Sequence, residues 1–368
     1  MTLIFLYGTL RHDALRKIVL GEDAPAHKAL LPGHGVFHAG QAAFPMIAEA
    51  SGAAQGLAVE ASKAAVARMD YYEGAFGYDR RPALIEVDGE RRDAEIYWPQ
   101  TPPERGAAWS LEGWAATLGD LATETAHEAM WGFGRLSPAD LAANFTMMMR
   151  RADSRLRRRA SPGPVTRRSD LGRDDVNVED SNRWLSFFAF EENRLRHRRF
   201  DGSMSDTVTR AGLHGCDAAI VLPYDPVRDR VLLVEQFRYA PFLMGDPRPW
   251  CLEPPAGLVD PGEAPEDAAR RELAEEAGVT AQRLEPVARC YPSPGALAEY
   301  QHIFVGITDL PDRAEGFGGL AEEYEDIRIH ILPFAELERL IETGEAAVGP
   351  LILAAMWLKL HRDRLRSA

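Results

Sequence analysis

The hydrophobic pattern along the first half of the chain predicts a mixture of strands and helices. Short β-prone runs between turn residues are typical of strands, and longer runs with apolar residues three or four positions apart are typical of helices. The predicted strands cover 3–7, 83–87 and 94–98, the last two around the turn Asp88-Gly89, and the predicted helices cover 61–70 and 111–130. We therefore expect an α+β domain over about 145 residues.

The second half shows the same mixture around one central helix. The predicted strands cover 184–191, 217–223, 230–236, 301–306 and 327–332, and the predicted helices cover 265–277, 334–343 and 350–364. No internal repeat relates the two halves. The pattern thus predicts a second α+β domain.

Length and composition agree with two domains. The chain has 368 residues, 46% of them hydrophobic and 27% charged, whereas a single domain usually holds about 100–200 residues. The three cysteines, Cys216, Cys251 and Cys290, form no close pair, which excludes a disulfide scaffold and a cysteine-based zinc site. The first residues do not resemble a signal peptide, and no apolar run approaches the length of a membrane span. We expect a cytoplasmic protein.

Charge is distributed unevenly. The net charge of −14 disfavours nucleic acid as the main ligand but allows a local phosphate site. The window 150–173 holds nine arginines against two aspartates, a net charge of +7, and contains the breaker cluster Ser-Pro-Gly-Pro at 161–164. We expect a linker at 150–180, with or without a short basic helix, between domains at 1–149 and 181–368; a patch for an anionic partner is the alternative.

The segment 257–279, GLVDPGEAPEDAARRELAEEAGV, carries the clearest chemical signal. Gly278 suits the left-handed position that ends a helix. Within that helix Glu272, Glu275 and Glu276 share one face, which we expect to be exposed. Like charges on one face repel each other, and a bound divalent cation would reverse that effect. Ligands that are all oxygen favour Mg²⁺ or Mn²⁺.

This segment resembles the box of the Nudix hydrolases, G-x5-E-x7-R-E-U-x-E-E-x-G-U, where U is aliphatic. The matching residues are Gly257, Glu263, Arg271, Glu272, Leu273, Glu275, Glu276, Gly278 and Val279. The resemblance implies an α/β/α sandwich with these metal ligands: the Ala256 carbonyl, Glu272, Glu276 and, supporting or sharing the task, Glu275. It also implies that Arg271 and Glu263 hold the loop against the helix. The alternative is an acidic surface helix.

The flanking sequence resembles one subgroup, the ADP-ribose pyrophosphatases. Pro294 stands 15 residues beyond Val279, and the stretches RHRRFDGSMSDTVTR, VLPYDPVRDRVLLVEQFRY and LAEEYEDIRIHILP resemble bacterial members. The resemblance implies Mg²⁺-dependent hydrolysis of a nucleoside diphosphate derivative, ADP-ribose being the best match, to AMP and ribose 5-phosphate. Some similar proteins carry a tellurite-resistance label, which we treat as a name because nothing in this sequence would bind tellurite.

The same resemblance implies roles for residues outside the box. Glu323 matches a catalytic base, Glu325 a further metal ligand and Arg238 a substrate contact. Arg210 and Glu299 match residues that reach the substrate from the partner subunit, which implies a homodimer built on this half. The alternatives are a solvated acidic loop at 322–326 and ordinary surface salt bridges for the other three residues. Phe187 is a candidate for stacking on adenine, with a core position as the alternative.

The first half resembles the gamma-glutamylcyclotransferase-like (AIG2-like) fold, a β-barrel with helices, over about 1–120. The resemblance is carried by Tyr7-Gly8-Thr9-Leu10, Phe44-Pro45, the segment 69–74, Tyr78, Arg81-Pro82 and Tyr97-Trp98. It implies that the backbone N–H groups of Tyr7, Gly8, Thr9 and Leu10 bind the substrate carboxylate, and that Glu73 moves protons while 5-oxoproline forms.

Non-catalytic alternatives remain for both halves. The first half is either a working cyclotransferase or a binding or dimer-stabilising module, and Glu73 favours the enzyme. The second half is either a hydrolase or a nucleotide sensor, and the complete box favours the hydrolase.

Overall fold

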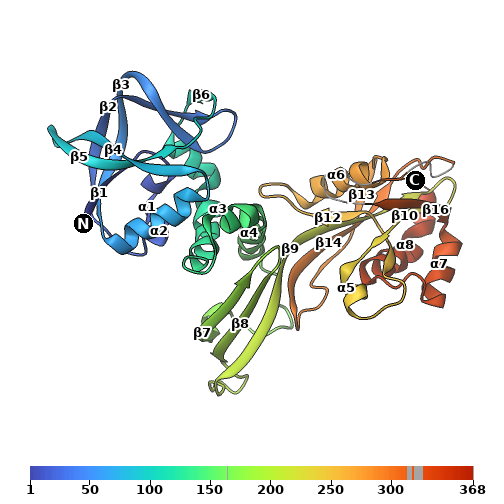
Figure 1. The fold of residues 1–368 in the computed structure, drawn as a ribbon. Helices are drawn as coiled ribbons and strands as arrows, with labels where there is room; N and C mark the ends of the chain where they lie inside the picture. The colour runs from blue at the N-terminus through green and yellow to red at the C-terminus, as the bar shows by residue number, and fades with distance from the viewer. Residues whose placement is uncertain (164, 313–316, 319–325, 368) are drawn as a thin grey trace. The chain divides into compact units, whose positions relative to one another are not determined.

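The computed structural model describes residues 1–163, 165–312, 317–318 and 326–367, in two compact units (Figure 1). One unit comprises Met1–Pro162 together with Leu185–Phe187, and the other comprises Gly163–Trp184 and Phe188–Ala368. Each unit has its own hydrophobic core. None of the described helices is both long enough and apolar enough to cross a bilayer.

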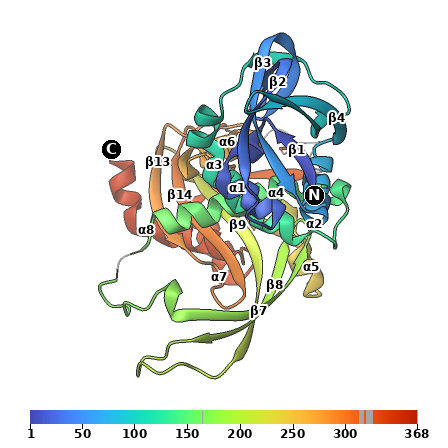
Figure 2. The ribbon, with the colours of Figure 1, turned by 90° about the vertical axis from the view of Figure 1, so that its left-hand side faces the viewer.

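The first unit is built on a closed sheet. Its strands are β1 (Thr2–Leu6), β2 (Ala26–Ala39), β3 (Pro45–Ala61), β4 (Tyr78–Val87), β5 (Glu90–Pro99) and β6 (Arg105–Ala108). They pair in the order β3-β1-β5-β4-β2-β6, and β3 also pairs with β2, so five strands close into a barrel. The long β2–β3 hairpin extends from one end of the barrel (Figures 1 and 2).

Helices cover this barrel and complete its core. They are the 3-10 turn η1 (Thr9–Arg11) and helices α1 (Asp13–Leu20), α2 (Lys63–Gly74), α3 (Leu111–Trp131) and α4 (Pro138–Ala160). One core cluster joins β1 and β3 to all four α-helices, while a second fills the barrel interior. Ser62 caps α2 by accepting a hydrogen bond from the Ala65 N–H at 3.1 Å, which fixes where this helix begins.

The sequence pattern predicted part of this unit correctly. The hairpin around Asp88-Gly89 is confirmed: both residues have positive φ, 52° and 83°, as the tight turn between β4 and β5 requires. The pattern did not predict β2 and β3, because glycine and alanine interrupt their alternation of polar and apolar residues. Gly56 in β3 has a tertiary reason, since a Cβ there would lie 2.4 Å from the Phe5 ring.

The second unit contains a larger mixed sheet. Its strands are β7 (Val176–Leu185), β8 (Ala189–His197), β9 (Val208–Asp225), β10 (Arg230–Phe237), β11 (Trp250–Glu253), β12 (Ala256–Leu258), β13 (Arg283–Cys290), β14 (Leu297–Ile307), β15 (Phe317–Gly318) and β16 (Ile327–Pro333). The main order is β13-β14-β9-β10-β16-β15, with β9 and β14 parallel. The remaining elements are η2 (Arg173–Asp175), α5 (Tyr239–Leu243), α6 (Pro265–Ala277), α7 (Phe334–Thr343) and α8 (Gly349–Arg366).

Two separate apolar clusters lie on the two faces of this sheet. Alternate residues of β9 point to opposite sides: Ile220 and Leu222 pack with α7 and α8, whereas Ala219 and Val221 pack with α6. Figure 1 shows the sheet between α6 and the α7–α8 pair. The α/β/α sandwich expected for this half is therefore confirmed.

The region between the two halves differs in detail from the pattern. The arginine-rich segment begins inside α4, which continues to Ala160, and of its described residues 161–163 and 165–172 lie outside helix and strand. The single strand predicted at 184–191 is wrong, because β7 ends at Leu185 and β8 begins at Ala189. The break could not be seen in the sequence pattern, because the apolar residues Leu185, Phe187 and Phe188 continue across it.

Candidate functional site

The loop between β12 and α6 is held by one arginine. Arg271 donates two hydrogen bonds to Glu263, from Nε to Oε1 and from Nη2 to Oε2, each at 3.0 Å, and Nη2 also donates to the Leu258 carbonyl at 3.0 Å. Glu263 Oε2 in turn accepts a hydrogen bond from the Asp260 N–H at 3.0 Å. The arginine therefore ties the loop to the middle of α6, as the resemblance to the Nudix box implied.

Gly257 is required by close packing in β12. A Cβ placed there would lie 2.1 Å from Oε1 and 2.5 Å from Oε2 of Glu272, far inside van der Waals contact. Because Gly257 is opposite Ala219 in the sheet, the backbone cannot easily withdraw. The absent side chain is what lets the Glu272 carboxylate lie against the end of this short strand.

Glu276 occupies a buried position on the same helix. Only 2% of its surface is exposed, and its Oε2 accepts a hydrogen bond from the Ala256 N–H at 2.9 Å. The expectation of a fully exposed acidic face is therefore wrong for this residue, because β12 folds over the end of the face. The Ala256 backbone and the Glu276 carboxylate are consequently neighbours.

The other two glutamates of the cluster contact Arg271. Its Nη1 donates to Glu272 Oε1 at 2.5 Å and to Glu275 Oε2 at 3.1 Å, which offsets their mutual repulsion. Nowhere in the described ranges do three or more acidic, histidine or cysteine side chains form a group able to enclose a metal ion. The donor set nevertheless fits a hard cation, since every candidate ligand atom is an oxygen.

Arg238 lies at the start of α5 and contacts a carboxylate that sequence reasoning missed. Its Nε and Nη2 donate to Glu253 Oε2 at 2.8 and 2.6 Å. Burial lowers the pKa of Arg238, but the carboxylates of Glu253 and Glu276 outweigh it and raise the pKa overall. Glu253 is the last residue of β11, three positions before Ala256, and only its place in the fold connects it with the box.

Arg210 and Glu299 lie on the neighbouring strands β9 and β14. Arg210 is exposed, and its Nη1 donates to the Thr209 carbonyl at 2.9 Å. Burial raises the pKa of Glu299, and Gln301 Nε2 donates to its Oε1 at 2.8 Å. Arg210 and Glu299 do not form an ion pair with each other. Their roles toward a partner subunit stay predictions.

Three further residues are predicted for this half, namely Glu323, Glu325 and Phe187. Glu323 and Glu325 lie outside the described residues. Phe187 is 55% exposed, not in a core, and its carbonyl accepts a hydrogen bond from Arg151 Nη1 at 2.7 Å. It groups with the first compact unit. Its stacking role stays a prediction.

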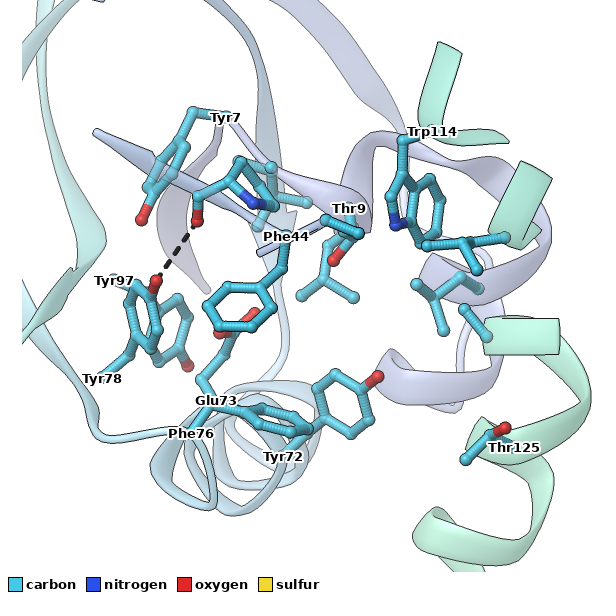
Figure 3. A pocket seen from close by; sticks show the side chains of 18 of the residues that line it. Tyr7, Thr9, Phe44, Tyr72, Glu73, Phe76, Tyr78, Tyr97, Trp114 and Thr125 are labelled. Atoms are coloured by element: carbon cyan, nitrogen blue, oxygen red, sulfur yellow. Dashed lines mark hydrogen bonds between the residues drawn. The ribbon is translucent and has the colours of Figure 1, made fainter. Parts of the chain in front are cut away.

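A second site lies in the barrel unit, where a cavity of about 380 Å³ opens beside the loop after β1. Tyr7, Gly8, Thr9 and Leu10 line it together with Glu73 from the last turn of α2. Figure 3 shows the Glu73 carboxyl group among the residues that line the cavity. The Tyr7–Leu10 loop and Glu73 are far apart in the sequence, and the structure brings them together at one cavity.

Glu73 has an unusual electrostatic environment. Burial raises its pKa to about 7, and in the described part of the chain we find no hydrogen bond or ion pair to its carboxyl group. Burial, followed by the repulsion from Glu73, raises the pKa of Tyr78 to about 12. The Tyr78 hydroxyl therefore stays protonated. The Glu73 carboxyl group, in contrast, can both accept and donate a proton near neutral pH.

Asp70 and Arg80 form a hydrogen-bond network close to Glu73 in the sequence. Arg80 Nε donates to Asp70 Oδ1 at 2.6 Å and also pairs with Glu95, while Tyr97 Oη donates to Asp70 Oδ1 at 2.8 Å. This network ties α2 to β4 and β5. Sequence reasoning assigned no role to Asp70 or Arg80, although Asp70 stands only three residues before Glu73.

Comparisons with known proteins fall on the same two units. Residues 216–352 match the NUDIX domain family, and residues 4–116 match the family described as Gamma-glutamyl cyclotransferase, AIG2-like. The ADP-ribose pyrophosphatase of Escherichia coli strain K12 is 40% identical over 205 residues, which are 55% of this chain and 95% of the relative. The ADP-ribose pyrophosphatase of Haemophilus influenzae is 36% identical, covering 50% of this chain and 84% of the relative. A GDP-mannose pyrophosphatase of Escherichia coli O1:K1 / APEC is 33% identical, covering 39% of this chain and 74% of the relative.

Proposed function

Because the chain belongs to the Nudix hydrolase family and carries a gamma-glutamyl cyclotransferase-like domain before its Nudix domain, we propose that the Nudix half hydrolyses ADP-ribose to AMP and ribose 5-phosphate. The observation that carries this proposal is the assembled box: Arg271 holds the loop, Gly257 leaves space for Glu272, and Glu276 lies against Ala256. The named activity of the 40% identical relative supports the choice of substrate.

Nudix hydrolases work with a divalent metal, and we propose Mg²⁺ or Mn²⁺ for this chain. The residues that would hold it are the Ala256 carbonyl, Glu272, Glu275 and Glu276, with Glu325 as a further ligand. When bound, the cation neutralises charge on the diphosphate oxygens during hydrolysis. Arg271 contacts Glu272 and Glu275, so its guanidinium orients these carboxylates from one side.

The substrate-binding roles are proposals of the same kind. Arg238 is fixed by Glu253 and presents its remaining N–H groups to a phosphate or ribose oxygen. Glu323 acts as the base that takes a proton from the attacking water. Arg210 and Glu299 complete the partner's pocket in a homodimer, and Phe187 stacks on adenine. We also propose a cytoplasmic location and the domain limits 1–149, 150–180 and 181–368.

A substrate panel tests the hydrolase proposal. The full chain with Mg²⁺ is incubated with ADP-ribose, GDP-mannose and other nucleoside diphosphate derivatives, and nucleotide release is measured. We expect ADP-ribose to show the highest kcat/KM and to yield AMP. A clear preference for GDP-mannose would reject the substrate assignment, and tight nucleotide binding without turnover would favour the sensor.

A second activity, gamma-glutamyl cyclotransfer in the barrel unit, is favoured by one observation: a carboxyl group with a pKa of about 7 lies in the cavity beside the Tyr7–Leu10 loop. We propose Glu73 as its acid-base residue and the loop N–H groups as the carboxylate contact. Release of 5-oxoproline from γ-glutamyl compounds tests this activity. Loss of release in Glu73→Gln is expected, and unchanged release would reject the role.

A further inference from the structure

Figure 3 shows Glu73 on one side of the barrel cavity and Trp114 and Thr125, both from α3, on the other, so the cavity has two chemically different ends. Its reacting end consists of the Tyr7–Leu10 loop and Glu73, within the part of the chain that matches the cyclotransferase family. The other end is formed by α3 and α4, mostly beyond residue 116, where that match stops. The residues from these helices are Trp114, Leu118, Leu121, Ala122, Thr125, Phe145 and Met149.

The helical end is apolar and carries no charge. Among the described residues that line the cavity, Glu73 is the only ionisable side chain besides the tyrosines, and no lysine, arginine or histidine is present. The one hydroxyl at the helical end belongs to Thr125, and it donates to the Leu121 carbonyl at 2.7 Å. A carboxylate entering this end would therefore lose its hydration without gaining a cationic partner.

The helices that form this end are fixed in place. Ser137 begins α4 with a capping box, and Leu141 and Met148 on the same helix are fully buried in the core. Phe145 packs edge to face on Phe76, with ring centroids 4.8 Å apart and an interplanar angle of 88°. The apolar end is thus preformed, which lowers the entropic cost of binding an apolar group there.

Resting on the cyclotransferase activity proposed above, we propose that this cavity takes γ-glutamyl amides whose leaving amine carries a bulky, apolar, uncharged group. The α-carboxylate and amine of the glutamyl part lie at the reacting end, and the apolar group occupies the part of the cavity that α3 and α4 line. Compounds whose leaving group ends in a carboxylate, such as γ-glutamyl-glycine or glutathione, fit this end poorly.

The reaction needs no co-reactant. The α-amino nitrogen attacks the γ-carbonyl carbon, forming the C–N bond of 5-oxoproline while the original amide C–N bond breaks. Glu73 accepts the proton lost by the attacking nitrogen and returns it to the nitrogen of the departing amine. The substrate is thereby converted into 5-oxoproline and a free amine, with all atoms accounted for.

Three substrates separate size from charge. The full chain is assayed with γ-glutamyl-phenylethylamide, γ-glutamyl-ethylamide and γ-glutamyl-glycine, and 5-oxoproline is measured. We expect kcat/KM to be at least about tenfold higher for the phenylethylamide than for γ-glutamyl-glycine, with the ethylamide between them. Phe145→Ala should reduce this preference, whereas the exposed neighbour Thr146→Ala should keep it. Equal rates or a preference for γ-glutamyl-glycine would overturn the inference.

Calorimetry keeps this inference separate from the activity on which it rests. Binding of the phenylethylamide and of γ-glutamyl-glycine is measured on the full-length Glu73→Gln variant, which needs no turnover. If no compound yields 5-oxoproline, the cyclotransferase proposal fails, yet tighter binding of the phenylethylamide still supports the apolar specificity. Equal binding of the two compounds, or none of either, overturns it.

Discussion

Arg271 and Glu263 form two hydrogen bonds of 3.0 Å, one from Nε and one from Nη2, across the loop that leads into α6. The same guanidinium contacts Glu272 and Glu275, the next carboxylates along the helix. One arginine therefore fixes the loop and orients two candidate metal ligands together. Lysine could not replace it, because a single ammonium group cannot make this fork of parallel bonds.

Glu276→Gln should lower kcat for ADP-ribose by several orders of magnitude with little effect on folding. Gln keeps an oxygen for the Ala256 N–H, so we expect the free energy of unfolding to change by about 1 kcal/mol or less. Steady-state kinetics with saturating Mg²⁺ and chemical denaturation measure the two effects. The exposed Glu266→Gln on the same helix is the matched control, and turnover of both variants near that of the wild type would refute the ligand assignment.

Gly257→Ala should destabilise the second unit by about 1–3 kcal/mol and reduce hydrolysis, because its Cβ would overlap the Glu272 carboxylate. Thermal unfolding and the ADP-ribose assay report on this change. Gly349→Ala serves as the control, since a Cβ at that position meets nothing within 4 Å. Equal melting temperatures for the two variants would show that β12 relaxes more easily than the packing indicates.

Glu73 should make folding of the barrel unit pH-dependent. Its pKa is near 7 when folded, against about 4.3 for a free glutamate, so the folded state holds an extra proton between these values. As pH rises through this window the wild type should lose about 1–3 kcal/mol relative to Glu73→Gln. Denaturation curves at pH 4 and pH 8 measure this difference. The exposed Glu60→Gln is the matched control, and a parallel trend in both variants would contradict the assignment.

Trypsin should cut the folded chain first after Arg167, Arg168 or Arg173, which lie in the exposed stretch between α4 and β7. Arg151 should be protected, because it is 1% exposed inside α4 and pairs with Glu128 at 2.6 Å. Mass spectrometry of the fragments locates the cuts. Resistance of the whole stretch 161–173 would mean that this segment packs against the units and is no linker.

Mixing Arg210→Ala with Glu276→Gln subunits should restore activity if Arg210 reaches the partner's pocket. Each mixed dimer then contains one site with both residues intact, so random mixing yields about one quarter of wild-type activity. Activity equal to the average of the two parent variants would place Arg210 in its own subunit's site. Sedimentation of the unmixed proteins checks that they dimerise; a monomer at assay concentration would rule out a dimer altogether.

Local sequence determined the bounds of the central helix. Helix α6 has the predicted bounds because Pro265 begins it and Gly278, with φ of 65°, ends it. The contact between Arg271 and Glu263, which the resemblance to the Nudix box implied, is also present in the structure. Such features are short in sequence and governed by backbone geometry, so the order of residues is sufficient to predict them.

Tertiary structure decided what depends on distant segments. Glu276 is buried only because β12 returns beside α6, and Glu253 meets Arg238 only because β11 pairs with β10. The apolar end of the barrel cavity likewise arises where α3 and α4 approach a loop more than 100 residues earlier. Strand pairing and helix packing set these distances through contacts between remote residues, and no local pattern in the chain encodes them.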